Sequence, residues 1–538
     1  MKKNLHQLKE TICNPAYYFI FICFFLIKTV NAQVYSEIDN NNIKAGFWNE
    51  GTFFWDKASS PKFEVPKNSN KHANFASGLW ISGIDDGGML IAAAQTYCQT
   101  GTDYQFGPIA TNRSANNYIQ RYNKIWKINT SEINYHIQNY NNPNYVIPNQ
   151  ILSWPGNGVV SNGEPTQLAP YFDSNSNNIY DPINGDYPLI KGEQALFYIF
   201  NDNKVHTETG SSVPFKFDFY VMAYVFTPIN QALNNTVFID IKIVNKSART
   251  YSNLKLGMWD DPDLGAYIDD FIGCDVGRNL SFVYNAVDID APNGENTYGA
   301  NPPSMGVQFL SHKMDNMMYY INNSTNQGNP SNSNQIDKYL SAKWRDGVQL
   351  TYGGSGYGGS SNCNYAFPWD TDSNNPQTWM QTGTANDLRF IPSTNLGELS
   401  PNQSICFTMA YTVSFGDSGA ISSVYKLKQD ADFIKEFYSQ NELNNCSQTS
   451  SPLSLNNKNE KNYWEIFPNP NNGKFQIMYS DGNEFLSLIE VFSIDGKKIF
   501  ENKITSNKQS FVIEYPGVYL IKATDKDNFI QLKKLVVK

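Results

Sequence analysis

The sequence predicts a mainly β protein, in which a β-sandwich central region with one late helix precedes a small immunoglobulin-like β-sandwich at the C-terminus. Three observations support this fold class. The chain of 538 residues is 41% hydrophobic and 14% aromatic but only 17% charged, so it can build cores and favours strands. Short runs rich in Val, Ile, Phe and Tyr recur along it, and turn-forming Asn, Asp, Gly and Pro separate these runs.

The central region, residues 33–445, is expected to contain most of the strands. The segment 237–244 alternates apolar and polar side chains at its centre, as a half-buried antiparallel strand does. A sub-boundary is expected near residue 190. The expected strands are 78–84, 195–200, 215–226, 237–245, 254–259, 282–287, 306–310 and 404–415.

One helix is expected in the central region, over 418–438. Its apolar side chains recur at every third or fourth position, so they gather on one face of a helix. These side chains are Val424, Leu427, Ala431, Ile434 and Phe437.

Residues 1–32 are expected to be a secretory signal peptide. Lysines at positions 2, 3 and 9 precede an apolar run at 17–27, and Val30 and Ala32 stand before the cleavage position. The apolar run is too short to cross a bilayer, which needs about 20 residues. The mature protein is therefore expected to have no transmembrane segment and to be exported through the periplasm.

The C-terminal region, 463–538, follows a polar linker at 446–462 and returns to short regular strands. Two prolines and a glycine enforce a tight corner at 468–473. An Asp-Gly pair at 495–496 is typical of a two-residue hairpin turn. About seven short strands with closely spaced turns indicate a small β-sandwich.

Three motifs of this region resemble the type A C-terminal sorting domain of the type IX secretion system of Bacteroidetes-type bacteria. They are the Pro-Asn-Pro-x-x-Gly corner, the Asp-Gly hairpin, and a Gly-x-Tyr strand followed by a lysine-rich terminal strand. The residues that carry the resemblance are Pro468, Asn469, Pro470, Gly473, Asp495, Gly496, Gly517, Tyr519 and Lys538. The alternative is an ordinary immunoglobulin-like module without a sorting role.

The resemblance implies that an outer-membrane translocon and its sortase recognise the C-terminal region. It also implies that the protein is secreted or displayed on the outer cell surface, either released or attached to lipopolysaccharide. The central region itself resembles uncharacterised secreted proteins of the same bacteria at 78–83, 260–275 and 386–390. That second resemblance implies no activity.

The charge of the chain excludes some partners. The net charge is −9, and residues 33–462 hold 27 Lys and Arg against 40 Asp and Glu. An acidic surface repels nucleic acid and anionic membranes, so neither is expected as a partner. The same surface is compatible with cations.

The first acidic segment, 173–181, predicts a calcium loop. Oxygen-bearing side chains recur at every second position and again at its end, as in loops that wrap a hard cation. The segment resembles EF-hand-like extracellular calcium modules, with Asn178 where glycine is usual and no Glu at the twelfth position. The alternative is an Asx-rich turn that needs no metal. The expected ligands are Asp173, Asn175, Asn177 and Asp181.

The second acidic segment, 260–275, places six carboxylates within sixteen residues, with Arg278 as the only cation nearby in the sequence. Like charges at this density are costly unless they are solvated, protonated or bridged by a cation. Interleaved apolar residues favour burial, so a structural calcium site is expected. The alternatives are a solvated loop and a catalytic carboxylate pair for glycoside hydrolysis. The expected ligands are Asp260, Asp261, Asp263, Asp269, Asp270 and Asp275.

The five cysteines of the mature chain contain no Cys-x-x-Cys pair, and a disulfide between Cys406 and Cys446 is the expected bridge. The four mature histidines stand at no metal-ligand spacing, and no His-Glu-x-x-His motif occurs.

The sequence therefore predicts a non-catalytic binding or adhesion module with structural calcium. Its partner is expected to be a glycan or another surface component. The alternative is a secreted hydrolase acting on polysaccharide or another polymer.

Overall fold

The computed structural model describes most of the chain from residue 34 onward. The N-terminal 1–32, the linker 446–462 and the turn residues Asp495 and Gly496 lie outside the described residues. The described residues are 34–98, 101–115, 117–227, 230–290, 296–369, 378–441, 443, 464–479, 486–493, 497–506, 508–525 and 530–538.

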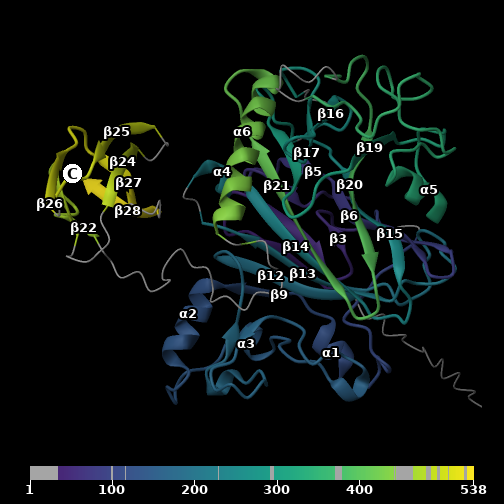
Figure 1. Ribbon diagram of the computed structural model, residues 1–538, viewed down its shortest axis with the longest axis horizontal. Helices are drawn as coiled ribbons and strands as arrows, with labels where there is room; N and C mark the ends of the chain where they lie inside the picture. The colour runs from purple at the N-terminus through teal and green to yellow at the C-terminus, as the bar shows by residue number, and fades with distance from the viewer. Residues whose placement is uncertain are drawn as a thin grey trace, which may run out of the picture. The chain divides into compact units, whose positions relative to one another are not determined.

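One sheet of the central region has ten strands, in the order β19-β20-β15-β6-β3-β2-β4-β5, with β1 beside β2 and β7 beside β6 (Figure 1). Neighbouring strands of this sheet pair antiparallel, and β15 runs between β6 and β20 along most of its length. The strands are β1 (Tyr35–Ile38), β2 (Lys44–Trp48), β3 (Thr52–Phe53), β4 (Phe63–Glu64), β5 (His72–Asn74), β6 (Ala76–Asp85), β7 (Leu90–Ala94), β15 (Tyr251–Asp261), β19 (Asn316–Ile321) and β20 (Leu388–Leu399).

A second sheet has nine strands, in the order β16-β17-β18-β21-β14-β13-β12-β8, with β9 beside β12. A short ribbon of β10 (Tyr171–Phe172) and β11 (Tyr187–Pro188) stands apart from it. The nine strands are β8 (Gln105–Phe106), β9 (Trp126–Asn129), β12 (Gln194–Asn201), β13 (Phe217–Val225), β14 (Thr236–Asn245), β16 (Asp270–Asp275), β17 (Leu280–Asn285), β18 (Ser304–Phe309) and β21 (Ser404–Ser414).

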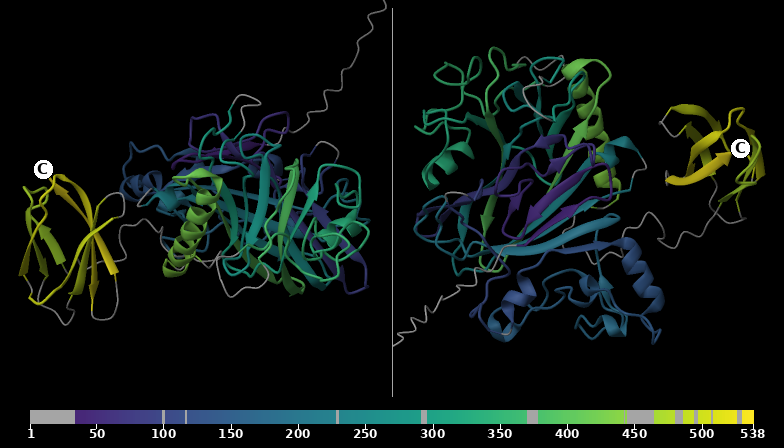
Figure 2. Two further views of the ribbon diagram at one scale, coloured as in Figure 1. Left: turned by 90° about the horizontal axis from the view of Figure 1, so that it is seen from above. Right: turned by 180° about the vertical axis from the view of Figure 1, so that it is seen from behind.

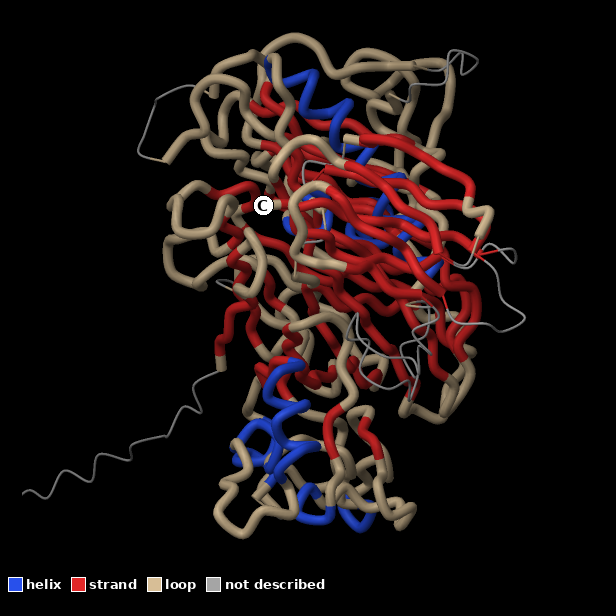
Figure 3. The backbone as a smooth tube through the Cα atoms, turned by 90° about the vertical axis from the view of Figure 1, so that its left-hand side faces the viewer, coloured by secondary structure: helices blue, strands red, loops and turns tan. Residues whose placement is uncertain are grey.

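The main core fills the space between the two sheets, which form stacked layers (Figure 3), and it continues onto the other face of the ten-stranded sheet, where Tyr339 of α5 (Ser333–Tyr339) packs on Tyr320 of β19. Burying these apolar faces provides the dominant driving force for folding. A second core covers the other face of the nine-stranded sheet, where Trp126, Trp154 and Phe238 pack together with residues of 118–199. Because of this second core, β14 is buried on both faces over its first half, and the expectation of a half-buried strand at 237–244 is wrong there.

Six α-helices accompany the sheets in the described part of the chain. The expected helix is confirmed as α6 (Gly419–Gln440), which packs Val424 and Leu427 against β17 and runs along one side of the strands (Figure 2). The sequence reasoning missed α2 (Thr130–Asn139), although Asn129 and Glu132 form a capping box at its start. The others are α1 (Tyr118–Tyr122), α3 (Asn149–Leu152), α4 (Gln231–Asn234) and α5 (Ser333–Tyr339), with 3-10 turns at Val160–Asn162 and Pro182–Asn184.

The C-terminal domain is a seven-stranded sandwich of two sheets, as expected. Its sheets have the orders β22-β23-β26 and β25-β24-β27-β28. Its core, which includes Trp464, Val491, Ile521 and Leu535, draws only on residues of this domain. The strands are β22 (Trp464–Phe467), β23 (Lys474–Tyr479), β24 (Leu486–Ser493), β25 (Lys498–Lys503), β26 (Lys508–Val512), β27 (Gly517–Asp525) and β28 (Ile530–Val537).

All eight strands expected in the central region are present, with ends no more than three residues from those expected, and the mainly β fold class is confirmed. Cys406 is disulfide-bonded, and Cys446, its expected partner, lies outside the described residues. Cys98, Cys274 and Cys363 are free thiols. Within the described ranges, no helix has the length and hydropathy needed to span a membrane.

Candidate functional site

The second acidic segment is divided between the two faces of β15. Successive side chains of a strand point to opposite faces, so Asp260 and Asp261 are directed apart. The Asp260 carboxylate accepts a hydrogen bond from Tyr411 of the nine-stranded sheet at 3.0 Å, which places it between the sheets. Asp261 therefore lies on the outer face of the ten-stranded sheet.

On that outer face, Asp261 meets Asp263 and Asp387, and we refer to these three residues as the acidic centre. One carboxylate oxygen of each lies within 4.8 Å of the others. Strand β15 pairs antiparallel with β20, with Asp260 opposite Phe390, so the end of β15 meets the start of β20. This pairing brings Asp387 to a site for which the sequence had suggested only residues of 260–275.

A single guanidinium partly neutralises the acidic centre. Arg389 places Nη2 3.2 Å from Oδ2 of Asp261 and pairs through Nη1 with Asp387. The Tyr97 hydroxyl donates to Oδ2 of Asp261 at 2.5 Å and accepts from Arg389 at 2.7 Å. When the acids are ionised, three carboxylates and one guanidinium carry a net charge of −2, which one divalent cation would balance.

Burial disfavours the charged form of these acids. It raises the pKa of Asp261 to about 6, although the charge of Arg389 opposes the shift. Burial and the charge of Asp261 raise the pKa of Asp263 well above its usual value. Oδ1 of Asp261 is buried and has no hydrogen-bond partner in the described part of the chain. A proton or a metal ion would relieve this unsatisfied charge.

Asp260 has a separate environment. Its Oδ1 accepts from Asn74 and Tyr411, each at 3.0 Å, and from Ser77, while Oδ2 has no partner among the described residues. Burial raises its pKa to about 7. The side chain therefore links strands of both sheets inside the core, and it does not join the acidic centre.

The remaining acids of the segment also go to different places. Asp275 pairs with Arg278 at 2.9 Å and with Lys428 of α6 at 3.3 Å. Asp270 is buried and accepts from the backbone N–H of Leu264 at 2.9 Å, and its pKa is raised by burial and by the charge of Asp269. Of the six expected ligands, Asp261 and Asp263 belong to the acidic centre, while Asp270 lies near enough to Asp269 and Asp263 for their charges to raise its pKa.

The first acidic segment keeps its expected shape as a local loop. Asp173 accepts hydrogen bonds from the backbone N–H groups of Asn177 and Asn178, at 3.2 and 2.7 Å. The amide Nδ2 atoms of Asn175 and Asn177 lie 3.5 and 3.0 Å from the Asp181 carboxylate, while their Oδ1 atoms accept from the backbone N–H groups of Asn177 and Ile179. This is the hydrogen-bonding pattern of an Asx-rich turn. Asn178 has the left-handed φ of 63° that glycine usually supplies in such loops.

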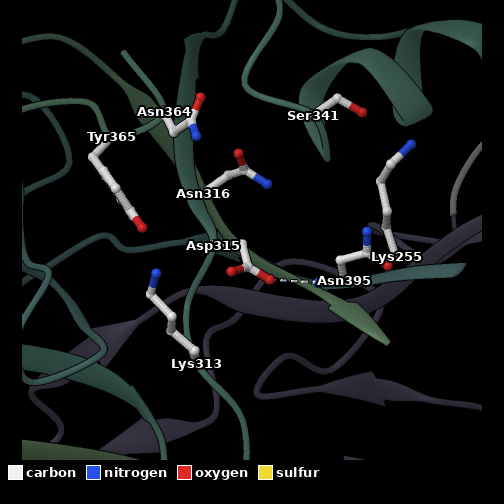
Figure 4. A pocket seen from close by; sticks show the side chains of 8 residues that line it. All are labelled: Lys255, Lys313, Asp315, Asn316, Ser341, Asn364, Tyr365 and Asn395. Atoms are coloured by element: carbon white, nitrogen blue, oxygen red, sulfur yellow. Dashed lines mark hydrogen bonds between the residues drawn. The ribbon is translucent and has the colours of Figure 1, made fainter. Parts of the chain in front are cut away.

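A polar hollow of about 390 Å³ opens at the other end of β15 and β20 (Figure 4). Lys255 of β15, Asn316 of β19 and Asn395 of β20 contribute to its wall. Figure 4 shows Lys313 and Tyr365 directing their polar ends toward the same space as Asp315. The wall also includes Ser341 and Asn364. Sequence reasoning did not suggest this site, because no motif marks it.

The motif residues of the C-terminal domain are held against its last strand. Asn469 donates to the carbonyl of Lys534 at 2.6 Å and accepts from the N–H of Val536 at 2.9 Å. The N–H of Lys538 donates to the carbonyl of Asn471 at 2.8 Å. Gly473 has a φ of 91°, and a Cβ there would lie 2.6 Å from the carbonyl oxygen of Ile513, so only glycine fits.

The other motif residues complete this arrangement. The Tyr519 hydroxyl donates to the carbonyl of Tyr515 at 2.8 Å and so pins the turn before β27. Gly517 begins that strand, which pairs with β28 along its whole length. Pro468 and Pro470 both follow cis peptide bonds.

Comparisons with known proteins identify the C-terminal domain only. A search of curated proteins found no match. Among solved structures, a polysaccharide lyase is similar at 8% identity and a TM-score of 0.19, covering 60% of this chain and 34% of its own. The chain thus spans about a third of the length of that lyase. A GalM/aldose epimerase homologue from C. elegans is similar at 10% identity and a TM-score of 0.23, covering 72% of this chain and 100% of its own.

Scores this low support no conclusion about fold or activity. The family model described as the secretion system C-terminal sorting domain matches residues 465–538. This match confirms the resemblance drawn from the Pro-Asn-Pro-x-x-Gly corner and the terminal strand. Residues 465–538 are therefore a type IX secretion system C-terminal sorting domain, which interacts with that secretion machinery and directs the chain to the cell surface or beyond.

Proposed function

We propose that the central region is a non-catalytic binding or adhesion module of the cell surface, and that calcium at the acidic centre stabilises it. The fixed positions of the acids carry this proposal, because most carboxylates of 260–275 diverge and both Asp261 and Asp387 of the acidic centre are paired with Arg389. Glycoside hydrolysis uses two carboxyl groups on either side of one bond, about 5–10 Å apart. Here Asp260 faces the core, Asp261 is held by Arg389, and Asp275 is paired with Arg278 and Lys428.

Calcium suits the acidic centre for two reasons. Its ligands in proteins are carboxylate and carbonyl oxygens, with waters completing a shell of six to eight. A divalent ion would also balance the net charge of −2 and offset the cost of ionising Asp261 and Asp263 in a buried position. Because the centre joins β15 to β20, the ion would tie two core strands together.

The loop at 173–181 is the second place where calcium would bind. Asn175 and Asn177 contact Asp181 there, Asp173 accepts from backbone N–H groups of the same loop, and Asp186 accepts from the N–H groups of Ser174 and Asp181. The loop is largely exposed, so an ion there would order the loop and would contribute less to the core.

Thermal unfolding of the purified chain tests the calcium proposal. Binding to the folded state alone raises the free energy of unfolding by about 1.4 kcal/mol at ten times the Kd, so millimolar calcium should raise the melting temperature and chelator should lower it. Replacing Asp263 and Asp387 together by asparagine should remove most of this shift. The matched pair, Asp173→Asn with Asp181→Asn, should leave most of it. An unchanged melting temperature with no calcium in the purified protein would refute the proposal.

Two further experiments test the sorting role of the C-terminal domain and the non-catalytic role of the central region. In the native host, deletion of 463–538 should leave the central region in the periplasm, and normal surface display of the truncated chain would contradict the sorting role.

A panel of polysaccharide and peptide substrates should show no turnover. Turnover that is lost in Asp261→Asn but kept in Asp275→Asn would favour the hydrolase alternative.

A further inference from the structure

The polar hollow lies on the same sheet as the acidic centre but is a separate site. Lys255 and Asp261 both belong to β15, six residues apart, which corresponds to about 20 Å along a strand. Lys255 pairs with Asn395 across β15 and β20, and an isolated bridge between Met317 and Tyr365 holds the segment at 364–365 beside β19. The wall of the hollow is therefore built on three neighbouring strands and does not depend on the carboxylates discussed above.

The lining residues offer hydrogen-bond donors and acceptors throughout. Three are asparagines, two are lysines, and the others are an aspartate, a serine and a tyrosine. The asparagines are Asn316, Asn364 and Asn395. Amides of this kind both donate and accept, so they suit the hydroxyl groups of a sugar, which do the same. A volume of about 390 Å³ lies in the range of small-molecule sites.

The charges of the lining are unevenly compensated. Lys255 is 2.7 Å from Asp337, which also accepts from Ser82, so its charge is neutralised. Asp315 accepts from the backbone N–H of Asn395 at 2.9 Å and fixes the start of the wall. Lys313 is exposed and has no ion-pair partner within the described ranges. It supplies an available positive charge at the mouth of an amide-rich hollow, whose one carboxylate, Asp315, is held by the N–H of Asn395 and the hydroxyl of Thr394.

Several polar atoms of the wall have no hydrogen-bond partner among the residues that the structure describes, so they can contact a ligand. Nδ2 of Asn316 donates to the carbonyl of Leu340 at 3.2 Å, which leaves its Oδ1 available as an acceptor. Oδ1 of Asn395 accepts from the N–H of Gly397 at 2.8 Å, which leaves its Nδ2 available as a donor. These internal bonds fix the side chains in place, so a ligand meets a preorganised surface.

We propose that this hollow binds an acidic sugar unit of a polysaccharide, with the carboxylate at Lys313 and the hydroxyl groups at the asparagine amides. The inference rests on the proposed binding function and names its ligand class. Among the described residues only one carboxylate, Asp315, lines the hollow, and glycoside hydrolysis normally needs two, so the lining lacks the carboxylate pair of a hydrolase.

Calorimetric titration of the purified chain with a uronate oligosaccharide, and with a neutral oligosaccharide of equal length, tests this inference. The uronate oligosaccharide should bind more tightly than the neutral one. Added salt should weaken its binding, because the contact is partly ionic. Lys313→Gln should weaken binding roughly tenfold, as expected for the loss of one charge-assisted hydrogen bond. Asn364→Ala should also weaken binding of the uronate oligosaccharide. Lys435→Gln, on the exposed face of α6, is the matched control and should have no effect.

The outcomes separate this inference from the proposal on which it rests. Failure of the uronate to bind, or equal binding by the Lys313→Gln variant, would overturn the acidic-sugar assignment and leave the calcium and surface roles standing. Equal competition by poly-glutamate would show that the hollow recognises charge alone, and would also overturn it. Cleavage of the bound oligosaccharide would instead refute the non-catalytic proposal and leave the ligand class intact.

Discussion

The two acidic segments of the central region collect carboxylates in opposite ways. The loop at 173–181 draws all its oxygens from nine consecutive residues, and its own backbone N–H groups satisfy Asp173. The acidic centre is assembled from the end of β15 and the start of β20, and Arg389, its one cation, lies 128 residues along the chain from Asp261. The loop is largely exposed, whereas Asp261 is only 2% exposed.

This difference determines how much each site affects stability. An exposed carboxylate that accepts backbone hydrogen bonds is stable without an ion, so calcium there adds little to the fold. A buried carboxylate with an open lone pair carries a desolvation cost until a cation or a proton arrives. We therefore expect calcium to order the loop only locally, and calcium at the acidic centre to stabilise the contact between β15 and β20.

The largest expected effect is at Arg389. Arg389→Gln removes the one positive charge that holds Asp261 and Asp387, and breaking a buried pair in this way costs about 3–5 kcal/mol. Urea unfolding in chelator should show this loss for the central region. Calcium should restore part of it, because the net charge of the centre falls to −3 in the variant.

Arg249→Gln is the control for that experiment. Arg249 also pairs with a buried carboxylate, Asp85, but its own side chain is 48% exposed, and Asp85 keeps hydrogen bonds from the N–H groups of Gly87 and Met89. We expect a loss of less than about 1 kcal/mol. Equal losses in the two variants would mean that the acidic centre does not depend on its guanidinium.

An intermediate effect is expected at Asp260, and it depends on pH. Its folded pKa of about 7 lies above the ordinary value of 3.8, so the folded state binds a proton that the unfolded state has lost. Its contribution to stability is therefore full below about pH 4, falls as the pH rises, and is lost above pH 7. The slope is about 1.4 kcal/mol per pH unit where it is steepest.

Asp260→Asn should flatten this slope. The amide oxygen can still accept from Asn74, Ser77 and Tyr411, and no proton is needed. Stability measured by urea unfolding from pH 4 to pH 8, in chelator, should fall less steeply in the variant than in the wild type. Since Glu208 and Asp218 also have raised pKa values, the difference between the two curves is the quantity to measure. Parallel curves would contradict the assignment.

The smallest expected effect is at the loop. Asp173→Asn keeps one oxygen to accept from the backbone of Asn177 or Asn178, so stability in chelator should change by less than about 1 kcal/mol. The calcium dependence of loop protection from hydrogen exchange should nevertheless weaken. A loss as large as that of Arg389→Gln would remove the distinction between the two sites.

The same contrast explains what the sequence could predict. Helix α6, the eight expected strands and the loop at 173–181 follow from local periodicity and spacing, which sequence carries directly. Asp387 joined the acidic centre only through the register of β15 with β20, and Lys428 reached Asp275 only through the packing of α6. Such contacts depend on which strands and helices pack together, so no pattern within a short stretch of sequence predicts them.

Helix α2 and the polar hollow were not predicted from the sequence, for other reasons. Helix α2 was missed because only Ile133 and His136 anchor its buried face beyond the first residue, too few for a clear period, although its capping box was present in the sequence. The polar hollow was missed because asparagine is abundant throughout this chain. A cluster of asparagines becomes informative only when strands place it around one space.

The contact between the sorting motif and strand β28 makes the Pro-Asn-Pro corner sensitive to trimming. Asn469 takes its position from backbone atoms of Lys534 and Val536, and Asn471 from those of Val536 and Lys538. Proteolytic removal of 534–538 would leave Pro468 to Gly473 in place but would remove these hydrogen-bond partners. We therefore expect damage to β28 to disturb a motif that lies more than sixty residues earlier in the chain.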